Sequence, residues 1–292
     1  MKYAIIGAGG TGGSLGFFMT KAGKDVTLIA RGKHLEMIRK NGLGMEQLWD
    51  HERENIPVKA CMAEEYNEIP DVILVCVKGY SMTETIPVIR KIAGKDTVVI
   101  PILNIYGTGG KLQKEFPELV VPDGCIYVSA NILEPGVILR HGKILRVVFG
   151  ARKPEEETEK MRMIAKDMAC ENIEVILSED IRRDAMVKFS YVSPIGVAGL
   201  YCNASAGDFQ KEGEAREMFK ALIREIVELS HAMGIEIQED LVERNLNIVA
   251  PLEPEATTSM QRDVYAGRKS EIDGLVYEIV RLGREYGVPV PE

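Results

Sequence analysis

The chain begins with a short apolar run that leads directly into a glycine-rich turn. Residues 2–6 read KYAII, the pattern G-x-G-x-x-G follows at residues 7–12, and a helical pattern extends over residues 11–22. In such a turn the first glycine permits a sharp bend, the second lets a pyrophosphate approach the backbone, and the third permits close packing of helix on strand. The helix start then offers N–H groups to phosphate. The pattern therefore predicts a dinucleotide site at Gly7, Gly9, Gly10 and Gly12. A tight turn without a ligand is the alternative.

The end of the second apolar run, residues 25–29, indicates which dinucleotide binds. An NAD enzyme typically carries an acidic residue about 20 residues beyond the glycines, where it holds the ribose hydroxyls. Here Asp25 starts the run, whereas Arg31, with Lys33 close by, follows its end. A guanidinium can pair with a 2′-phosphate and stack on adenine. Arg31 therefore favours NADP (NADPH) over NAD, and a solvated loop charge is the alternative.

Strand-like and helical stretches alternate through the first part of the chain. Apolar runs rich in β-forming residues lie at residues 2–6, 25–29, 72–77, 97–102 and 125–129. Strands separated by helices form βαβ units, and near-continuous apolar strands are typical of a parallel sheet buried on both faces. Residues 144–150 and 173–177 look like later strands that finish this sheet.

The pattern changes after about residue 180. Apolar residues recur at helical spacing over residues 218–227, Gly234 supplies a stop, and a final helical pattern extends from Ile272 to about Gly287. We therefore predict an α/β architecture in which residues 1–180 form a Rossmann dinucleotide-binding domain. Residues 181–292 are expected to form an all-helical domain that carries substrate and catalytic residues.

Composition excludes several classes of function. The formal net charge of −8 argues against a nucleic-acid partner, which would select a basic face. No apolar run is long enough to span a bilayer and no leader-like segment precedes the first strand, so we expect a cytoplasmic protein without a membrane partner. The five cysteines contain no Cys-x-x-Cys pair and the four histidines lack ligand spacing. Free thiols and no metal site are expected.

Two ionisable residues in the later part of the chain are candidates for chemistry. Lys188 lies in the stretch AMVKFSYV, with apolar neighbours on both sides. Burial of an ammonium is costly unless it is paired or its pKa falls, so this lysine is a candidate general acid or substrate ligand. A lysine that reaches to the surface is the alternative. Glu271 follows Ser270 at the start of the last helical pattern, where helix capping explains an acidic residue well.

Two further polar residues follow predicted strands. Lys78 ends the run at residues 72–77, and Asn104 lies just past the run at residues 97–102. Ligands bind at the carboxyl ends of the strands in an open parallel sheet. Both residues are therefore candidates for ligand contact, although polar loop residues are also common there.

Taken together, these residues resemble the ketopantoate reductase (2-dehydropantoate 2-reductase) family over essentially the whole chain. The resemblance rests on Gly7–Gly12, Arg31, Asn41-Gly42-Leu43, Val77-Lys78, Asn104, Lys188, Ser259-Met260-x-x-Asp263 and Glu271-Ile272-Asp273. It implies NADPH-dependent reduction of a 2-keto acid to a 2-hydroxy acid on the route to pantothenate, in a cleft between a Rossmann and a helical domain. The family contains monomers and dimers, so a homodimer stays open.

The resemblance also implies a role for each candidate. Lys188 would hydrogen-bond the ketone oxygen and donate a proton as the hydride arrives, which is general acid and electrostatic catalysis. Glu271 would orient that lysine or bind the substrate hydroxyl. Asn104 would lie beside the nicotinamide and the lysine. Ser259 would help to hold the substrate carboxylate, and Lys78 would line the cofactor side.

Some positions depart from the family pattern. Val192 and Gly196 stand where family members carry asparagines that bind the polar end of the substrate, and Ile105 replaces a glycine. Family members also continue through another short helix after the position of Pro291. A related reductase with a different keto-acid substrate and a non-catalytic NADP(H)-binding sensor are therefore alternatives. Retention of both Lys188 and Glu271 weighs against the sensor.

Overall fold

The computed structural model describes residues 1–291, and these residues form two compact units. The first unit contains residues 1–103 and 107–181, and the second contains residues 104–106 and the described chain from Arg182 onward. Within the described residues, no helix combines the length and the apolar character that crossing a membrane requires.

The first unit is built on a parallel sheet with the strand order β5-β2-β1-β6-β7. The strands are β1 (Lys2–Ile6), β2 (Asp25–Ile29), β5 (Lys59–Cys61), β6 (Val72–Val75) and β7 (Val98–Pro101). Every neighbouring pair is parallel. The helices are α1 (Gly10–Lys21), α2 (Gly32–Asn41), α3 (Met82–Ile92), α4 (Thr108–Glu115) and α5 (Glu159–Met168). The predicted Rossmann class is confirmed.

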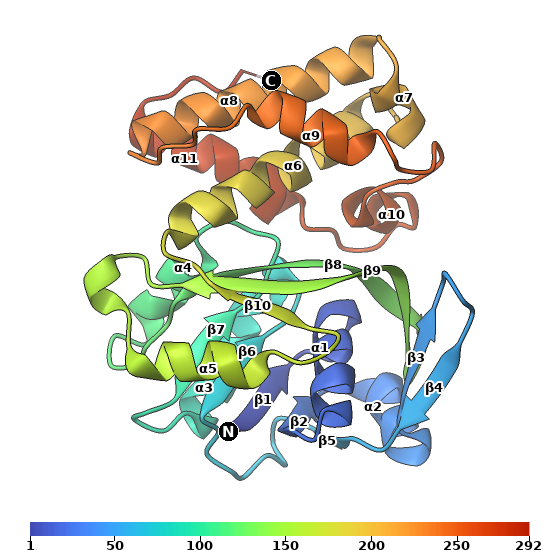
Figure 1. The fold of residues 1–292 in the computed structure, drawn as a ribbon, viewed down its shortest axis with the longest axis vertical. Coiled ribbons are helices and arrows are strands. Elements are labelled where there is room, and N and C mark those ends of the chain that lie inside the picture. Colours follow the sequence, from blue (N-terminus) through green and yellow to red (C-terminus); the bar gives the residue numbers. More distant parts are fainter. Residues whose placement is uncertain (292) are drawn as a thin grey trace. The chain divides into compact units, whose positions relative to one another are not determined.

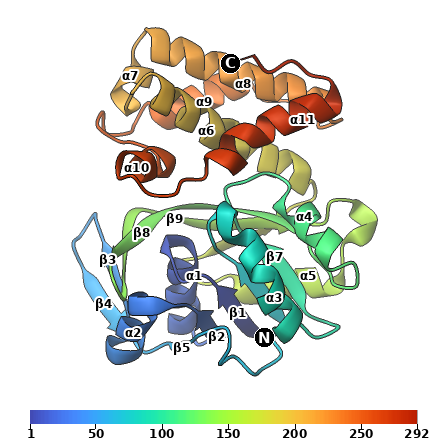
Figure 2. The ribbon, with the colours of Figure 1, turned by 180° about the vertical axis from the view of Figure 1, so that it is seen from behind.

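Both faces of this sheet are buried, which explains why its strands are almost entirely apolar. Side chains alternate between the two faces of a strand. On β1, Tyr3 and Ile5 therefore join a core with α1 and α5, whereas Ala4 and Ile6 join a second core with α3 and α4. Figure 1 shows α5 in front of the strands, and Figure 2, drawn from behind, brings α3 to the front.

A second, mixed sheet has the order β10-β9-β3-β4, with β8 paired to β9. Its strands are β3 (Leu43–Gln47), β4 (Arg53–Ile56), β8 (Asp123–Glu134), β9 (Val137–Gly150) and β10 (Glu174–Leu177). The strands predicted at residues 125–129, 144–150 and 173–177 do form, but they belong to this sheet and do not finish the first one. β8 and β9 pair antiparallel as a long hairpin. The apolar pattern of a strand does not show which other strand it pairs with. The sequence therefore could not assign these strands to one sheet or the other.

The second unit is helical throughout its described elements, as predicted. They are α6 (Ile181–Tyr201), α7 (Ala206–Gln210), α8 (Glu214–Ala232), α9 (Leu241–Val249), α10 (Ser259–Tyr265), the π-helical turn η3 (Asp273–Tyr277) and α11 (Glu278–Tyr286). Gly234 and Gly287 follow the ends of α8 and α11 with φ angles of 67° and 70°, the left-handed region that favours glycine. Figure 1 shows α8 and α9 beside one another, in orange.

Candidate active site

The glycine-rich turn joins β1 to α1, and the fold itself requires three of its glycines. Gly7 has a φ of 97°, and its N–H donates to the Ile29 carbonyl at 3.0 Å. A Cβ on Gly12 would lie 1.9 Å from the Gly7 carbonyl oxygen, and a Cβ on Gly10 would lie 2.3 Å from the Ala130 carbonyl oxygen. Close packing therefore explains these positions, as expected for the contact between helix and strand.

Gly9 differs from its neighbours because a Cβ there would meet no atom within 4 Å. It is the N-cap of α1, and among the described residues no side chain caps this helix start. N–H groups in the first turn of a helix lack intrahelical partners and attract anions. The first turn of α1 also carries no acidic residue. An open backbone position at an uncapped helix start fits the pyrophosphate of a dinucleotide.

Arg31 and Lys78 follow β2 and β6, the two strands that flank β1 in the parallel sheet. Arg31 is the N-cap of α2, its side chain is 84% exposed, and its Nη1 lies 3.4 Å from Glu84 Oε2. An exposed ion pair of this kind contributes little to stability, so the guanidinium can turn to an anionic ligand at small cost. Lys78 precedes the 3₁₀ turn η1 (Gly79–Ser81), where its carbonyl accepts the Ser81 N–H at 2.8 Å.

Lys188 lies on α6 of the second unit and is buried, with only 8% of its surface exposed. Its Nζ donates a hydrogen bond to Oδ1 of Asn104 over 2.6 Å. Hydrogen bonds from charged donors contribute about 1.5–3 kcal/mol, so Asn104 offsets part of the cost of burying the ammonium. Lys188 therefore does not extend along the surface into solvent, which was the alternative interpretation of the sequence.

The segment that carries Asn104 is packed against helices on two sides. A Cβ on Gly274 of η3 would lie 2.1 Å from Ile105 Cδ1, so the glycine makes room for this segment. The Tyr106 ring lies 6.1 Å from the ring of Phe189, the residue next to Lys188. Asn104 is thus followed by two anchored side chains, which fix the position of its amide.

Glu271 is also buried, with 5% of its surface exposed. Its carbonyl oxygen accepts the Leu275 N–H at 2.9 Å, so Glu271 lies just before the helical turn η3. An acid that only complements a helix dipole can remain solvated, whereas a buried carboxyl group must be hydrogen-bonded. The burial of Glu271 therefore favours a role beyond capping.

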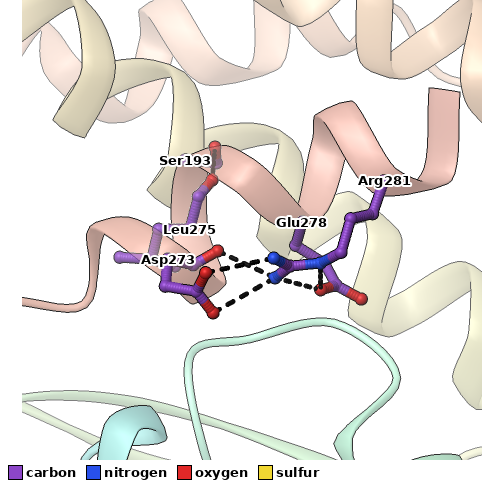
Figure 3. A network of polar contacts seen from close by, with 5 residues as sticks. All are labelled: Ser193, Asp273, Leu275, Glu278 and Arg281. Carbon is purple, nitrogen blue, oxygen red and sulfur yellow. Dashed lines mark hydrogen bonds and ion pairs between the residues drawn. The ribbon is translucent and has the colours of Figure 1, made fainter. Parts of the chain in front are cut away.

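Polar contacts hold the π-helical turn that follows Glu271 (Figure 3). Arg281 Nη1 donates to Asp273 Oδ1 at 3.1 Å, and its Nε donates to Glu278 Oε2 at 2.9 Å. The buried hydroxyl of Ser193 on α6 donates to the Leu275 carbonyl. These bonds tie the helix of Lys188 to the stretch that starts at Glu271. Single π-helical turns are frequent at functional sites.

The helix face beyond Lys188 is apolar. Val192 and Gly196 lie one and two turns after Lys188, on the same face of α6. A Cβ on Gly196 would lie 2.6 Å from Cε of the buried Met260, so a thioether fills this space. Met260 follows Ser259, the half-buried first residue of α10, whose N-cap is Thr258. Ser259 is thereby anchored close to α6.

Sequence reasoning missed two side chains that hold these arrangements in place. His34 contacts the backbone of the glycine-rich turn at Ala8, with 2.8 Å between Nε2 and the carbonyl oxygen. Ser193 bonds the Leu275 carbonyl, as described above. Both side chains bond to main-chain atoms, and such bonds leave no spacing pattern that a sequence could reveal.

Comparison with known proteins identifies the family. Residues 3–154 match the family model described as ketopantoate reductase PanE/ApbA, and residues 180–292 match the model of its C-terminal region. The chain therefore belongs to the ketopantoate reductase family, a family of oxidoreductases.

Individual relatives are distant but match along most of their length. A 2-dehydropantoate 2-reductase of Mesorhizobium japonicum is 29% identical over 311 residues, which cover 100% of this chain and 94% of that protein. The crystal structure of a PanE/ApbA family ketopantoate reductase from Ralstonia eutropha JMP134 is 25% identical, with a TM-score of 0.88 and coverage of 100% and 94%. A D-mandelate dehydrogenase, solved with NADH and anilino(oxo)acetate, shares the fold at 22% identity, with a TM-score of 0.88 and the same coverage.

Proposed function

We propose that this chain is an NADPH-dependent reductase of a 2-keto acid, with 2-dehydropantoate as the leading acceptor. The observation that carries the proposal is the buried Lys188 ammonium, held 2.6 Å from Asn104 Oδ1. A buried charge rarely improves stability over an apolar residue of similar size, so its presence favours a functional role. Family membership and the names of the relatives support the same reaction class.

Residues of the glycine-rich turn and of the neighbouring strand ends would hold the cofactor. The α1 start at Gly9 would bind the pyrophosphate, Arg31 the 2′-phosphate, and Lys78 and Asn104 the nicotinamide side. Bound NADPH would supply a hydride to the carbonyl carbon of the acceptor.

Lys188 would complete the reduction. Its ammonium would hydrogen-bond the carbonyl oxygen and transfer one proton to it as negative charge develops there, which yields a hydroxyl group and a neutral amine. Asn104 engages one of the three N–H donors of the ammonium and so fixes its direction. Glu271 would orient the amine or accept a hydrogen bond from the substrate, and Ser259 would bind the substrate carboxylate.

A reductase with a different keto-acid acceptor is the second candidate. Val192 and the contact between Gly196 and Met260 make the helix face beyond Lys188 apolar. A face of this kind offers few hydrogen bonds to the polar end of a substrate such as 2-dehydropantoate. The D-mandelate dehydrogenase of the same fold supports testing other acceptors.

NADPH oxidation, followed by absorbance across a panel of 2-keto acids, tests both candidates. Turnover of 2-dehydropantoate alone supports the first, and turnover of another acid supports the second. Lys188→Ala should lower kcat by a factor on the order of 100, in line with the loss of a general acid. Lys211→Ala is the matched control, because that lysine belongs to the same unit and its side chain is 71% exposed. Tight NADPH binding without turnover of any acid would contradict the proposal and support the sensor.

A further inference from the structure

His34 on α2 is joined through both ring nitrogens to the backbone of two other segments. Nε2 lies 2.8 Å from the Ala8 carbonyl oxygen, and the Gly136 N–H donates to Nδ1 at 2.9 Å. Because Nδ1 accepts a hydrogen bond, the ring proton lies on Nε2 and is donated to Ala8. A neutral imidazole in this one tautomer satisfies both contacts.

The first contact reaches the centre of the glycine-rich turn. Ala8 is buried and lies between Gly7, with its left-handed φ, and Gly9, with its open side. At Gly10 the same turn packs against the backbone of β8 at Ala130, which leaves no room for a Cβ atom. The turn is therefore held from α2 through His34 and from β8 through direct packing.

The second contact reaches the hairpin turn between β8 and β9. Gly136 has a φ of 88°, and a Cβ there would lie 2.9 Å from Cβ of Met37 on α2. The hairpin turn is thus packed closely on the helix that carries His34. Since β8 also abuts Gly10, His34 links the two segments that enclose the glycine-rich turn.

We propose that His34 is a positioning residue for the dinucleotide-binding turn, and that only its neutral form supports full affinity for NADPH. The proposal rests on the proposed function to the extent that the turn binds a dinucleotide. Protonation would place a hydrogen on Nδ1, opposite the Gly136 N–H, and would abolish that bond. The hairpin turn would separate from α2, and the bond to Ala8 would lose its fixed geometry.

The surroundings of the ring favour the neutral form near pH 7. Burial lowers the pKa of His34, and the bond to the Ala8 carbonyl opposes this shift only in part. Residues 7–10 contain no ionisable side chain. The charged groups of α2 and its N-cap are all exposed: Arg31, Lys33, Glu36, Arg39 and Lys40. Beside the hairpin turn, Glu134 pairs with Arg53 at 2.8 Å. Protonation is therefore expected only below about pH 6.5, the ordinary pKa of histidine.

Two substitutions separate the contacts. His34→Gln can place an amide N–H near the position of Nε2 and keep the bond to Ala8, whereas His34→Asn can place an amide oxygen near Nδ1 and keep the bond from Gly136. Neither side chain titrates. At pH 7.5, His34→Ala should raise the Kd of NADPH about 10-fold, the effect of losing two neutral hydrogen bonds. His34→Gln should stay closer to the wild type than His34→Asn.

NADPH binding is measured by fluorescence at pH 7.5 and pH 5.5, with His231→Gln as a control on an exposed histidine of α8. The 2′-phosphate of NADPH also titrates near pH 6. The informative quantity is therefore the ratio of the wild-type Kd to that of His34→Gln at each pH. This ratio should be higher at pH 5.5 than at pH 7.5.

Equal Kd values for wild type and His34→Ala at pH 7.5, or a ratio that is the same at both pH values, would overturn the proposal. If His34→Ala fails to fold, ¹⁵N chemical shifts of the wild-type ring decide the matter. They should report a bare Nδ1 and a protonated Nε2 at pH 7.5, and any other state contradicts it. If the His34 proposal holds and only the proposed function fails, NADPH binds with the expected pH dependence, but no 2-keto acid is reduced.

Discussion

Lys188 and Asn104 lie 84 positions apart in the sequence, and they meet in a hydrogen bond of 2.6 Å between Nζ and Oδ1. If this bond directs the ammonium at the acceptor, Asn104→Ala should lower kcat about 10- to 100-fold, since a hydrogen bond from a charged donor is worth about 1.5–3 kcal/mol. Asn104→Asp retains an acceptor oxygen and should keep more activity. Steady-state NADPH oxidation by both variants checks this, and an unchanged kcat in Asn104→Ala would show that the bond has no catalytic part.

Gly9 and Gly12 should respond in opposite ways to the same substitution. Gly9→Ala adds a methyl group where no atom lies within 4 Å, at an ordinary φ of −72°. The protein should stay folded with an unchanged midpoint of thermal unfolding, but NADPH should bind at least about 10-fold more weakly because the methyl group blocks the pyrophosphate.

Gly12→Ala places its methyl group 1.9 Å from the Gly7 carbonyl oxygen. The free energy of unfolding should fall by about 1–3 kcal/mol or more, as for other overpacked sites. Calorimetry and NADPH titration of both variants make the comparison. Destabilisation by Gly9→Ala, or full stability of Gly12→Ala, would be inconsistent with this division of roles.

Glu84 should weaken the preference for NADPH, because its carboxylate pairs with Arg31 at 3.4 Å and would lie close to a 2′-phosphate held there. Glu84→Gln removes this charge and should lower the Kd of NADPH about 2- to 5-fold, the range of exposed ion pairs. Arg31→Ala should raise the Kd of NADPH about 10-fold or more, as expected for loss of a charge-assisted contact to phosphate. NADH is the control ligand, and equal effects on NADH and NADPH would refute the assignment of Arg31.

Ile105 and Gly274 should be energetically coupled. Gly274→Ala directs a methyl group to within 2.1 Å of Ile105 Cδ1 and should destabilise the protein, whereas Ile105→Ala removes that obstacle. In the double variant the two effects should not add, with an interaction energy of about 1 kcal/mol or more, as for other residues in direct contact. Denaturant unfolding of the four proteins completes the cycle. Simple additivity would mean that segment 104–106 does not pack on η3 in solution.

The sequence was sufficient to locate single elements. The strands at residues 2–6 and 25–29 match β1 and β2 to the residue, because both runs are mostly apolar and each starts at a charged residue. The pairing of the strands, in contrast, could not be predicted from the sequence. β8 and β9 read as two more buried strands, and only the tertiary structure shows that they pair with each other in a separate sheet.

The residues of the candidate site were also only partly predictable from the sequence. The apolar neighbours of Lys188 correctly indicated burial, and the glycine spacing correctly indicated close packing of α1 on β1. The family resemblance implied that Asn104 lies beside Lys188, whereas the residue spacing alone could not pair them, since Asn104 comes from another part of the chain. His34 and Ser193 left no signal, because each bonds main-chain atoms, which every residue possesses.

Residues 104–106 lie in the chain among residues of the first unit, yet they pack with the second. This placement has a consequence for exchanging parts between relatives. A chimera joined at residue 181 would set the native Asn104 and Ile105 against foreign helices, so that the lysine and its amide partner, and Ile105 and its glycine, would come from different parents. Recombinants that carry the tripeptide together with the helical half should keep their activity, and those that divide the two should lose it.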